Sequence, residues 1–171
     1  ALGTEVDAEM LEKFLTFVVQ GEQTKAEAML KDNAALVLFS GPVTDFSGRY
    51  FEGITAFQYA VWALDTHMWK MLRHYLGAEE AFQQATMFET GSWVPIYGTD
   101  ATTHMENLIK CLRFYIKNYP TWSIEEATEY WKTEVGGAQY LVPVHVINEY
   151  CSSYRSFKPC PNFSEEDLFD R

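Results

Sequence analysis

The chain has 171 residues, with 13 Lys and Arg against 24 Asp and Glu, and a formal net charge of −11. Proteins that bind nucleic-acid polymers gain most of their non-specific affinity from positive charge, so this balance argues against such a partner. The 5 Trp, 10 Tyr and 12 Phe, in a composition that is 47% hydrophobic, exclude disorder for most of the chain and predict one sizeable aromatic core.

The cysteines and the apolar runs indicate the compartment. Cys111, Cys151 and Cys160 leave one thiol unpaired in any disulfide scheme, and none has the C-x-x-C spacing of a zinc or redox site. We therefore expect a reducing compartment. The longest apolar run, residues 34–39, is far shorter than the ~20 residues that span a bilayer, and the acidic N-terminus is unlike a signal peptide. Because the chain starts at Ala1, we expect a domain cut from a longer protein.

The first fifty residues predict two helices followed by a turn-rich segment. Apolar residues at helical spacing predict a helix over residues 6–19, and strong helix formers predict another over 24–31. Residues 34–39 are too short and too apolar for periodicity to separate a buried strand from a helical turn. Residues 40–53 are dense in turn formers and predict a hairpin or a structured loop. Any strands of this protein should lie there.

The middle of the chain predicts three more helices. Thr55 is expected to cap a helix over residues 56–64 that is apolar on nearly every side, which places it in the middle of the core. An amphipathic helix is predicted over residues 66–76, and residues 78–88 are also expected to be helical. Residues 91–99, with a proline and two glycines, are expected to form a loop.

The last third predicts three helices and an acidic end. Two capping boxes are predicted: Thr103 with Glu106, and Ser123 with Glu126. Pro120 should stop the first of these helices, and the second should end before Gly136 and Gly137. Pro143 can occupy the first turn of a final helix over residues 144–151.

The fold class follows from these elements. The chain is predicted to be mainly α, with α+β as the other option. We expect a single compact helical domain over residues 1–163, with a small β-hairpin or structured loop near residues 36–53. Residues 164–171 read as an acidic C-terminal tail or a linker to the rest of a larger protein.

Motifs for catalysis are weak. His145 and Glu149 are four residues apart on the predicted last helix, so they would share a face, as acid–base or metal-binding pairs do. A helix pair stabilised by local electrostatics is the plainer interpretation. Because the sequence has no P-loop, serine nucleophile elbow or Cys–His signature, its motifs do not support an enzyme.

Residues 43–74 interleave aromatic rings with the cations Arg49, Lys70 and Arg73. Rings beside a cleft can stack on a purine base while a nearby guanidinium or ammonium group binds the phosphates. The rings at helical spacing are expected to be core: Phe57, Trp62 and Trp69. The better candidates for ligand contact are Tyr59 and the two residues of the turn-rich segment, Tyr50 and Phe51.

Several segments carry a resemblance to a known family: residues 25–31, 43–49, 54–65, 67–69, 144–151, 155–157 and 159–161. The most specific stretch runs from Thr-Asp-Phe-Ser-Gly-Arg to Ala-Leu-Asp. In these segments the sequence resembles the KLAMP domain, a module that recurs in Legionella effector proteins. Together these segments span most of the chain between residues 25 and 161.

The resemblance implies an adenine-nucleotide-binding module in which two tyrosine rings stack on the base. The expected ring positions are Phe51 and Tyr59, with Tyr50 as the alternative to Phe51. With Phe51 as the first ring, this chain departs from the two-tyrosine pattern. Arg49, Lys70 or Arg73 would lie near the phosphates. We expect a ligand of the ADP, ATP or cyclic AMP class and no prosthetic group.

The resemblance also implies a virulence effector that a type IV system secretes into the host cytoplasm. Its expected partner is a small nucleotide, with a host protein as a further option, and neither a nucleic-acid polymer nor a membrane. Two alternatives stay open. One is a protein-interaction domain that docks onto a host partner through exposed aromatic residues. The other is a nucleotide-processing enzyme that uses His145 and Glu149.

Overall fold

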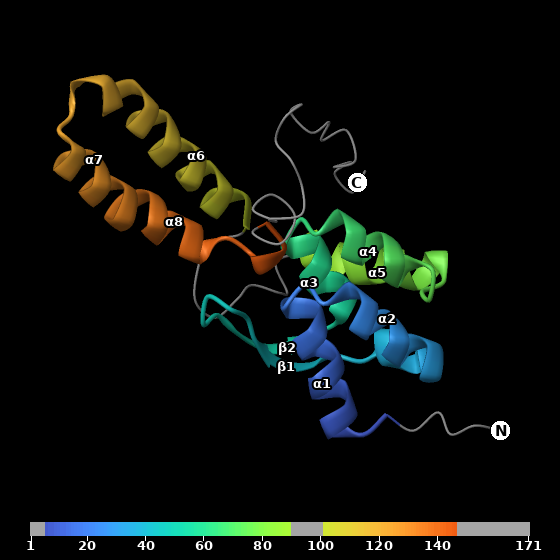
Figure 1. Ribbon diagram of the computed structural model, residues 1–171. Coiled ribbons are helices and arrows are strands. Elements are labelled where there is room, and N and C mark those ends of the chain that lie inside the picture. The colour runs from blue at the N-terminus through green and yellow to red at the C-terminus, as the bar shows by residue number, and fades with distance from the viewer. Residues whose placement is uncertain (1–5, 90–100, 147–171) are drawn as a thin grey trace. The chain divides into compact units, whose positions relative to one another are not determined.

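The computed structural model describes residues 6–89 and 101–146, which form two compact units (Figure 1). The first unit comprises residues 1–98 and the chain from Pro143 onward, and the second comprises Thr99–Val142. Most described residues are helical, and two short strands form one antiparallel sheet. The predicted fold class, mainly α with a small hairpin, is confirmed. The predicted tail over residues 164–171 lies outside the described residues.

The first unit begins with two α-helices and a short 3₁₀-helix. These are α1 (Ala8–Val19), α2 (Gln23–Asp32) and η1 (Ala34–Leu38). Asp7 caps α1 by accepting the backbone N–H of Met10 at 2.7 Å. Residues 34–39, for which the sequence did not separate a buried strand from a helical turn, contain η1 and are therefore mostly helical.

The turn-rich segment forms the predicted β-hairpin. Strands β1 (Gly41–Thr44) and β2 (Tyr50–Ile54) are antiparallel, with Val43 opposite Phe51. Helix α1 packs on β1 and on α2. One face of the hairpin is therefore buried, with Gly41 and Val43 of β1 and Phe51 and Ile54 of β2 in the core.

Three helices complete the first unit: α3 (Ala56–Trp62), α4 (Thr66–Arg73) and α5 (Ala78–Glu89). Helix α3 packs against α1, α4 and α5, so it occupies the middle of the core as predicted. Thr55 caps α3 with the side chain of Gln58 in a capping box. Helix α4 ends at Arg73, three residues before the predicted end at residue 76.

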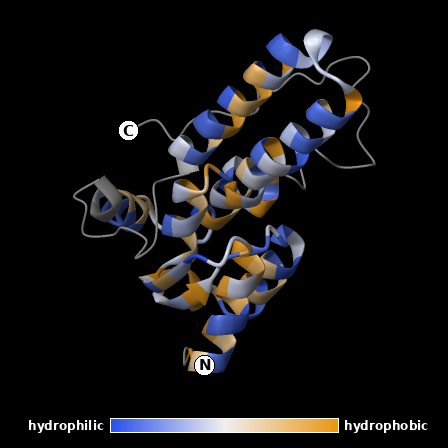
Figure 2. Cartoon of the chain, turned by 90° about the vertical axis from the view of Figure 1, so that its left-hand side faces the viewer, coloured by the Kyte–Doolittle hydropathy of each residue, from blue (hydrophilic) through white to orange (hydrophobic). Residues whose placement is uncertain are grey.

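The second unit is a helical hairpin. It consists of α6 (Ala101–Asn118), η2 (Tyr119–Thr121), α7 (Ile124–Tyr130), the π-helical turn η3 (Trp131–Val135) and α8 (Gly136–Leu141). Helix α6 lies antiparallel to the continuous run of α7, η3 and α8 (Figure 1). Hydrophilic and hydrophobic residues alternate along both arms (Figure 2).

Two predicted boundaries in the second unit are wrong. Helix α6 begins at Ala101, so Thr103 lies inside the helix and does not cap it. The helix predicted to end before residues 136–137 continues to Leu141, because Gly136 adopts the helical angles φ −63° and ψ −41°. Glycine in a helix costs about 1 kcal/mol relative to alanine but does not prevent the helix.

The other predicted stops and starts are confirmed. Helix α6 ends before Pro120, and Ser123 and Glu126 form a reciprocal capping box with hydrogen bonds of 2.8 and 3.1 Å. Residues 144–146 are helical directly after Pro143. The remainder of that predicted helix, and the predicted loop over residues 91–99, lie outside the described residues. Within the described ranges, no helix is both long enough and apolar enough to cross a membrane.

Candidate functional site

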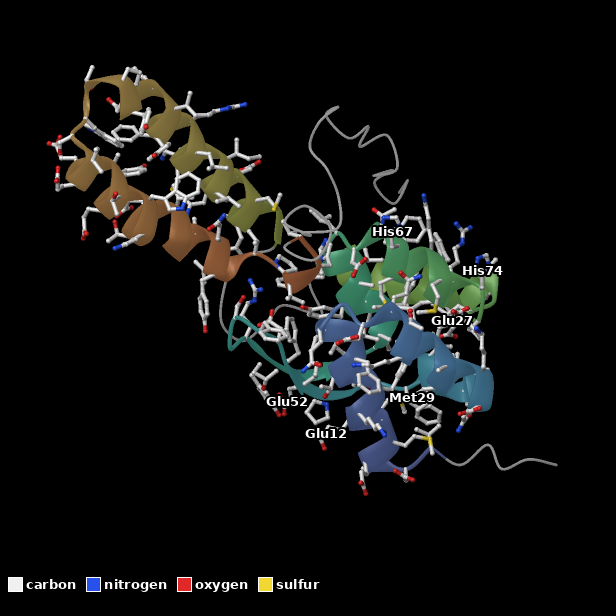
Figure 3. The ribbon with its side chains drawn as sticks, in the orientation of Figure 1. Glu12, Glu27, Met29, Glu52, His67 and His74 are labelled. Atoms are coloured by element: carbon white, nitrogen blue, oxygen red, sulfur yellow. The ribbon has the colours of Figure 1, made fainter. Side chains whose placement is uncertain are left out.

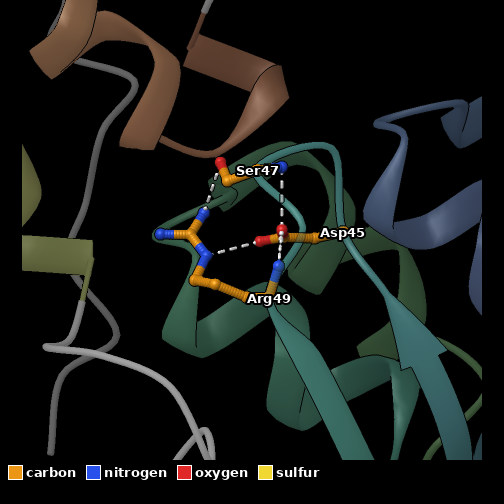
Figure 4. A network of polar contacts seen from close by, with 3 residues as sticks. All are labelled: Asp45, Ser47 and Arg49. Carbon is orange, nitrogen blue, oxygen red and sulfur yellow. Dashed lines mark hydrogen bonds and ion pairs between the residues drawn. The ribbon is translucent and has the colours of Figure 1, made fainter.

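Asp45 holds the turn of the β-hairpin (Figure 4). Its Oδ1 accepts the backbone N–H groups of Ser47 at 2.9 Å and of Arg49 at 3.0 Å. Gly48 completes the turn at φ +77°, a left-handed conformation that glycine adopts without strain. The sequence Asp-Phe-Ser-Gly-Arg therefore closes the hairpin and fixes Arg49 directly before β2.

Arg49 and Asp45 form a buried ion pair. The Nε of Arg49 donates to Oδ2 of Asp45 at 2.7 Å, and its Nη2 donates to Oγ of Ser47 at 3.1 Å. The guanidinium carbon of Arg49 lies 4.8 Å from the ring centroid of Trp62. Each charge of a buried pair needs the other, because a lone buried charge is strongly destabilising. The pair therefore fixes the guanidinium against the indole.

Three rings pack beside this ion pair. The Phe51 centroid lies 5.4 Å from that of Tyr59 and 5.3 Å from that of Trp62, both with edge-to-face geometry. The centroids of Tyr59 and Trp62 are 5.6 Å apart. All three side chains are at most 3% exposed. We call Asp45, Arg49, Phe51, Tyr59 and Trp62 the aromatic–ionic cluster.

Two polar atoms of the aromatic–ionic cluster are unsatisfied. In the described part of the chain, Oη of Tyr59 and Nε1 of Trp62 are buried and have no hydrogen-bond partner. Burial raises the pKa of Tyr59 above its usual range, and the carboxylate of Asp45, which lies close to the hydroxyl but outside hydrogen-bond geometry, adds to the shift, so the hydroxyl stays protonated. A buried donor without an acceptor costs about 1–3 kcal/mol. Two such donors on neighbouring rings are unusual in a native core.

Asp65 links α4 to the returning C-terminal part of the first unit. Its Oδ1 caps α4 by accepting the backbone N–H of Met68 at 3.0 Å, and its Oδ2 lies 4.0 Å from Nδ1 of His145. Leu64, directly before it, has φ +59°, which is strained for a leucine. His145 therefore faces a carboxylate, while its predicted companion Glu149 lies outside the described residues.

The structure brings together three of the sequence-predicted ligand residues. Arg49, Phe51 and Tyr59 all belong to the buried aromatic–ionic cluster. Tyr50 is exposed and lies on the opposite face of β2 from Phe51, because successive strand residues alternate. Phe51 and Tyr59 contact each other with their planes at 86°, so they do not face each other in parallel.

The other two predicted residues lie on α4. Lys70 and Arg73 are exposed, and Nζ of Lys70 lies 5.7 Å from the Trp69 ring centroid. His67 lies on α4, and His74 is the C-cap residue that follows it (Figure 3). This side of α4 therefore carries the exposed cations of the predicted site, whereas Arg49 is buried in an ion pair.

The predicted core rings are confirmed as core. Phe57, Trp62 and Trp69 are all buried. Sequence reasoning missed the polar role of Trp62, whose indole nitrogen is unsatisfied, and it also missed Asp45 and Asp65. The signals for both carboxylates were present. An Asp that begins a Gly-containing turn before Arg indicates a side-chain cap, and an Asp directly before a helix indicates an N-cap.

Among the described residues, no three His, Cys, Asp or Glu side chains are grouped so that they could hold a metal ion.

The uncharacterized protein CBUA0006 of Coxiella burnetii (strain RSA 493 / Nine Mile phase I) is 40% identical to this chain over 185 residues. The chain is a homologue of this Coxiella protein. The match covers 95% of this chain and 54% of the relative, so the chain spans about half the relative's length. A family model described as the CBUA0006 C-terminal domain matches residues 107–171. No solved structure matches the chain.

Proposed function

We propose that this chain is an adenine-nucleotide-binding module and that the base binds at the aromatic–ionic cluster. The observation that carries the proposal is the pair of buried donors, Tyr59 Oη and Trp62 Nε1, that lack acceptors within the described residues. A ligand with acceptor atoms would satisfy them and recover the cost of their burial. Adenine offers the ring-nitrogen acceptors N1, N3 and N7 on a flat aromatic body.

The ring geometry favours hydrogen bonding over stacking for a base that binds at this cluster. Because Phe51 and Tyr59 contact each other edge to face, a base would not lie between them as between two parallel rings. In this proposal the base accepts hydrogen bonds from Tyr59 and Trp62. Phe51 holds both rings in place through its edge-to-face contacts. Tyr50, on the other face of β2, is a weaker candidate for the ring beside the base.

The cations divide into two roles. Lys70 and Arg73 supply exposed positive charge on α4, the helix that follows α3, so they are our candidates for the phosphates. Arg49 is paired with Asp45 and lies over Trp62. We therefore assign Arg49 to positioning the indole rather than to the phosphates.

The resemblance to KLAMP domains of Legionella effectors supports the same ligand class, of ADP, ATP or cyclic AMP type. Secretion into the host cytoplasm is part of this proposal. The Coxiella homologue is itself uncharacterized. Two observations therefore support the proposed nucleotide binding: the buried donors of Tyr59 and Trp62, and the resemblance to KLAMP domains.

Calorimetric titration with ATP, ADP, AMP and cyclic AMP, and with GTP for comparison, tests this proposal. We expect saturable binding of at least one adenine nucleotide, and Tyr59→Phe should weaken it about 3- to 10-fold through loss of one hydrogen bond. Tyr50→Phe is the matched control, since it removes the same hydroxyl from an exposed ring. Absence of binding at millimolar nucleotide, or equal affinity in Tyr59→Phe, would contradict the proposal.

One observation favours the alternative of a nucleotide-processing enzyme. His145 lies 4.0 Å from a carboxylate oxygen of Asp65, and a carboxylate beside an imidazole can orient it for proton transfer. Under this alternative the wild-type chain converts the nucleotide, and His145→Ala binds it without turnover. A wild-type chain that binds nucleotide and leaves it unchanged over hours would sink this alternative.

A further inference from the structure

The second unit exposes more large apolar side chains than it buries. Of the fourteen exposed large hydrophobic residues among those described, eight lie in this unit: Ile109, Phe114, Ile116, Tyr119, Ile124, Trp131, Tyr140 and Leu141. Its buried hydrophobic residues are Leu108, Ala127, Val135, Ala138 and Val142. Apolar surface on this scale, interrupted by charges, is typical of an interaction surface.

Helix α6 carries an apolar stripe beside a basic row. The stripe residues recur at intervals of four, three and four, the spacing of a coiled-coil seam: Met105, Ile109, Leu112 and Ile116. Ile116 is 71% exposed. The row next to the stripe is exposed along its length; it begins with Glu106 and continues with the cations Lys110, Arg113 and Lys117. We call the four apolar residues and these three cations the basic stripe.

The opposite arm carries an apolar stripe beside acidic residues. Ile124, which is 82% exposed, and Trp131 are seven residues apart, so they share one side of α7 and η3. The exposed row beside them carries Glu125, Glu129 and, at its end, Lys132. We call Ile124, Trp131, Glu125 and Glu129 the acidic stripe.

The two stripes lie on the same side of the helical hairpin. Leu108 on α6 and Ala127 on α7 are both buried. Seen from the N-terminus of its helix, the apolar part of the basic stripe lies about 40–100° clockwise from Leu108, and Ile124 and Trp131 lie about 40–60° clockwise from Ala127. Trp131 also contacts the neighbouring arm, with its ring centroid 5.0 Å from that of Tyr115. Because the arms are antiparallel, offsets in the same sense bring both stripes to one side.

We propose that this side of the hairpin binds the same side of a second copy of the chain, as an antiparallel four-helix arrangement. The basic stripe of one copy would pack against the acidic stripe of the other, and two-fold symmetry would repeat the contact. One chain carries both the basic stripe and the acidic stripe, so a second copy can contact both. An acidic helix of another protein would contact only the basic stripe. Opposite charges beside an apolar seam select this pairing and its direction.

Sedimentation or light scattering measures the mass in solution. We expect the chain to reach twice the 19.7 kDa of the monomer as its concentration rises. Ile116→Lys should abolish this increase. Phe82→Lys is the control, because Phe82 is 69% exposed on α5 in the first unit and should leave the mass unchanged. A wild-type chain that stays monomeric would overturn the proposal, since another occupant must then cover the surface.

An exchange of charges tests the pairing itself. One variant carries Lys110→Glu and Arg113→Glu, and the other carries Glu125→Lys and Glu129→Lys; circular dichroism should show wild-type helicity for both. Each variant alone should be monomeric, because its two stripes then have like charge. An equal mixture should form pairs of one copy of each. Self-association of either variant at wild-type strength, or no association in the mixture, would contradict the proposed contact.

Discussion

Tyr59 and Trp62 lie three residues apart on α3, with ring centroids 5.6 Å apart, and each carries a buried polar atom without a hydrogen-bond partner among the described residues. A core built for stability alone would gain from phenylalanine at residue 59, because Phe keeps the ring contacts and removes the desolvated hydroxyl. We interpret these two donors as the part of the first unit that serves another molecule.

Tyr59→Phe should therefore stabilise the ligand-free protein. Removing a buried hydroxyl without a partner should raise the free energy of unfolding by about 1 kcal/mol. Urea denaturation measures this as a higher midpoint with an unchanged slope. A loss of 1 kcal/mol or more would mean that the hydroxyl has a stabilising partner in the folded chain, and the argument from unsatisfied donors would fail.

Tyr59 should also make the protein sensitive to alkali. Burial raises the pKa of Tyr59 above the unfolded value of 10.0. Ionisation of this group therefore leaves the free energy of unfolding unchanged below pH 10 and lowers it as the pH rises further. In that range only the unfolded state releases the proton, and the free energy of unfolding falls by about 1.4 kcal/mol per pH unit for this group. Stability curves between pH 8 and pH 11 should therefore be steeper for the wild type than for Tyr59→Phe. Parallel curves would contradict the burial of the hydroxyl.

The buried ion pair should respond strongly to loss of its acidic member. Asp45→Ala leaves the Arg49 guanidinium buried without its carboxylate and removes the acceptor of two backbone N–H groups in the turn. We expect a loss of about 3–5 kcal/mol in the free energy of unfolding. Asp45→Asn keeps an oxygen for the turn and should lose less. Equal losses in the two variants would show that the turn hydrogen bonds contribute nothing, and wild-type stability of Asp45→Asn would show that the charge contributes nothing.

Two glycines should respond to alanine with opposite signs. Gly48 has φ +77° in the hairpin turn, so Gly48→Ala should cost about 1–2 kcal/mol although no atom would contact the added methyl group. Gly137 lies in α8, where an added methyl group also contacts nothing, so Gly137→Ala should stabilise by about 0.5–1 kcal/mol. Thermal melts of both variants measure the difference. Stabilisation by Gly48→Ala would contradict the turn geometry.

The sequence predicted the parts of the fold that depend on local chemistry. The Thr55 cap, the Ser123 box and the stop at Pro120 follow from residues a few positions apart. The predicted helix end before Gly136 and Gly137 was wrong, because sequence alone does not show whether tertiary packing holds a glycine in helical conformation. The geometry of the cluster was also out of reach. The 86° angle between Phe51 and Tyr59, and the missing acceptors of Tyr59 and Trp62, arise from tertiary packing.

The indole N–H resonance of Trp62 tests the central claim most directly. The five tryptophans give five such signals in a proton–nitrogen correlation spectrum, and Trp62→Phe identifies the one from residue 62. If a bound adenine nucleotide accepts a hydrogen bond from Nε1, this signal should move downfield on titration, while the indoles of Trp122 and Trp131 in the second unit stay in place. A Trp62 signal that does not move at saturating nucleotide would contradict the proposal that this indole receives the base.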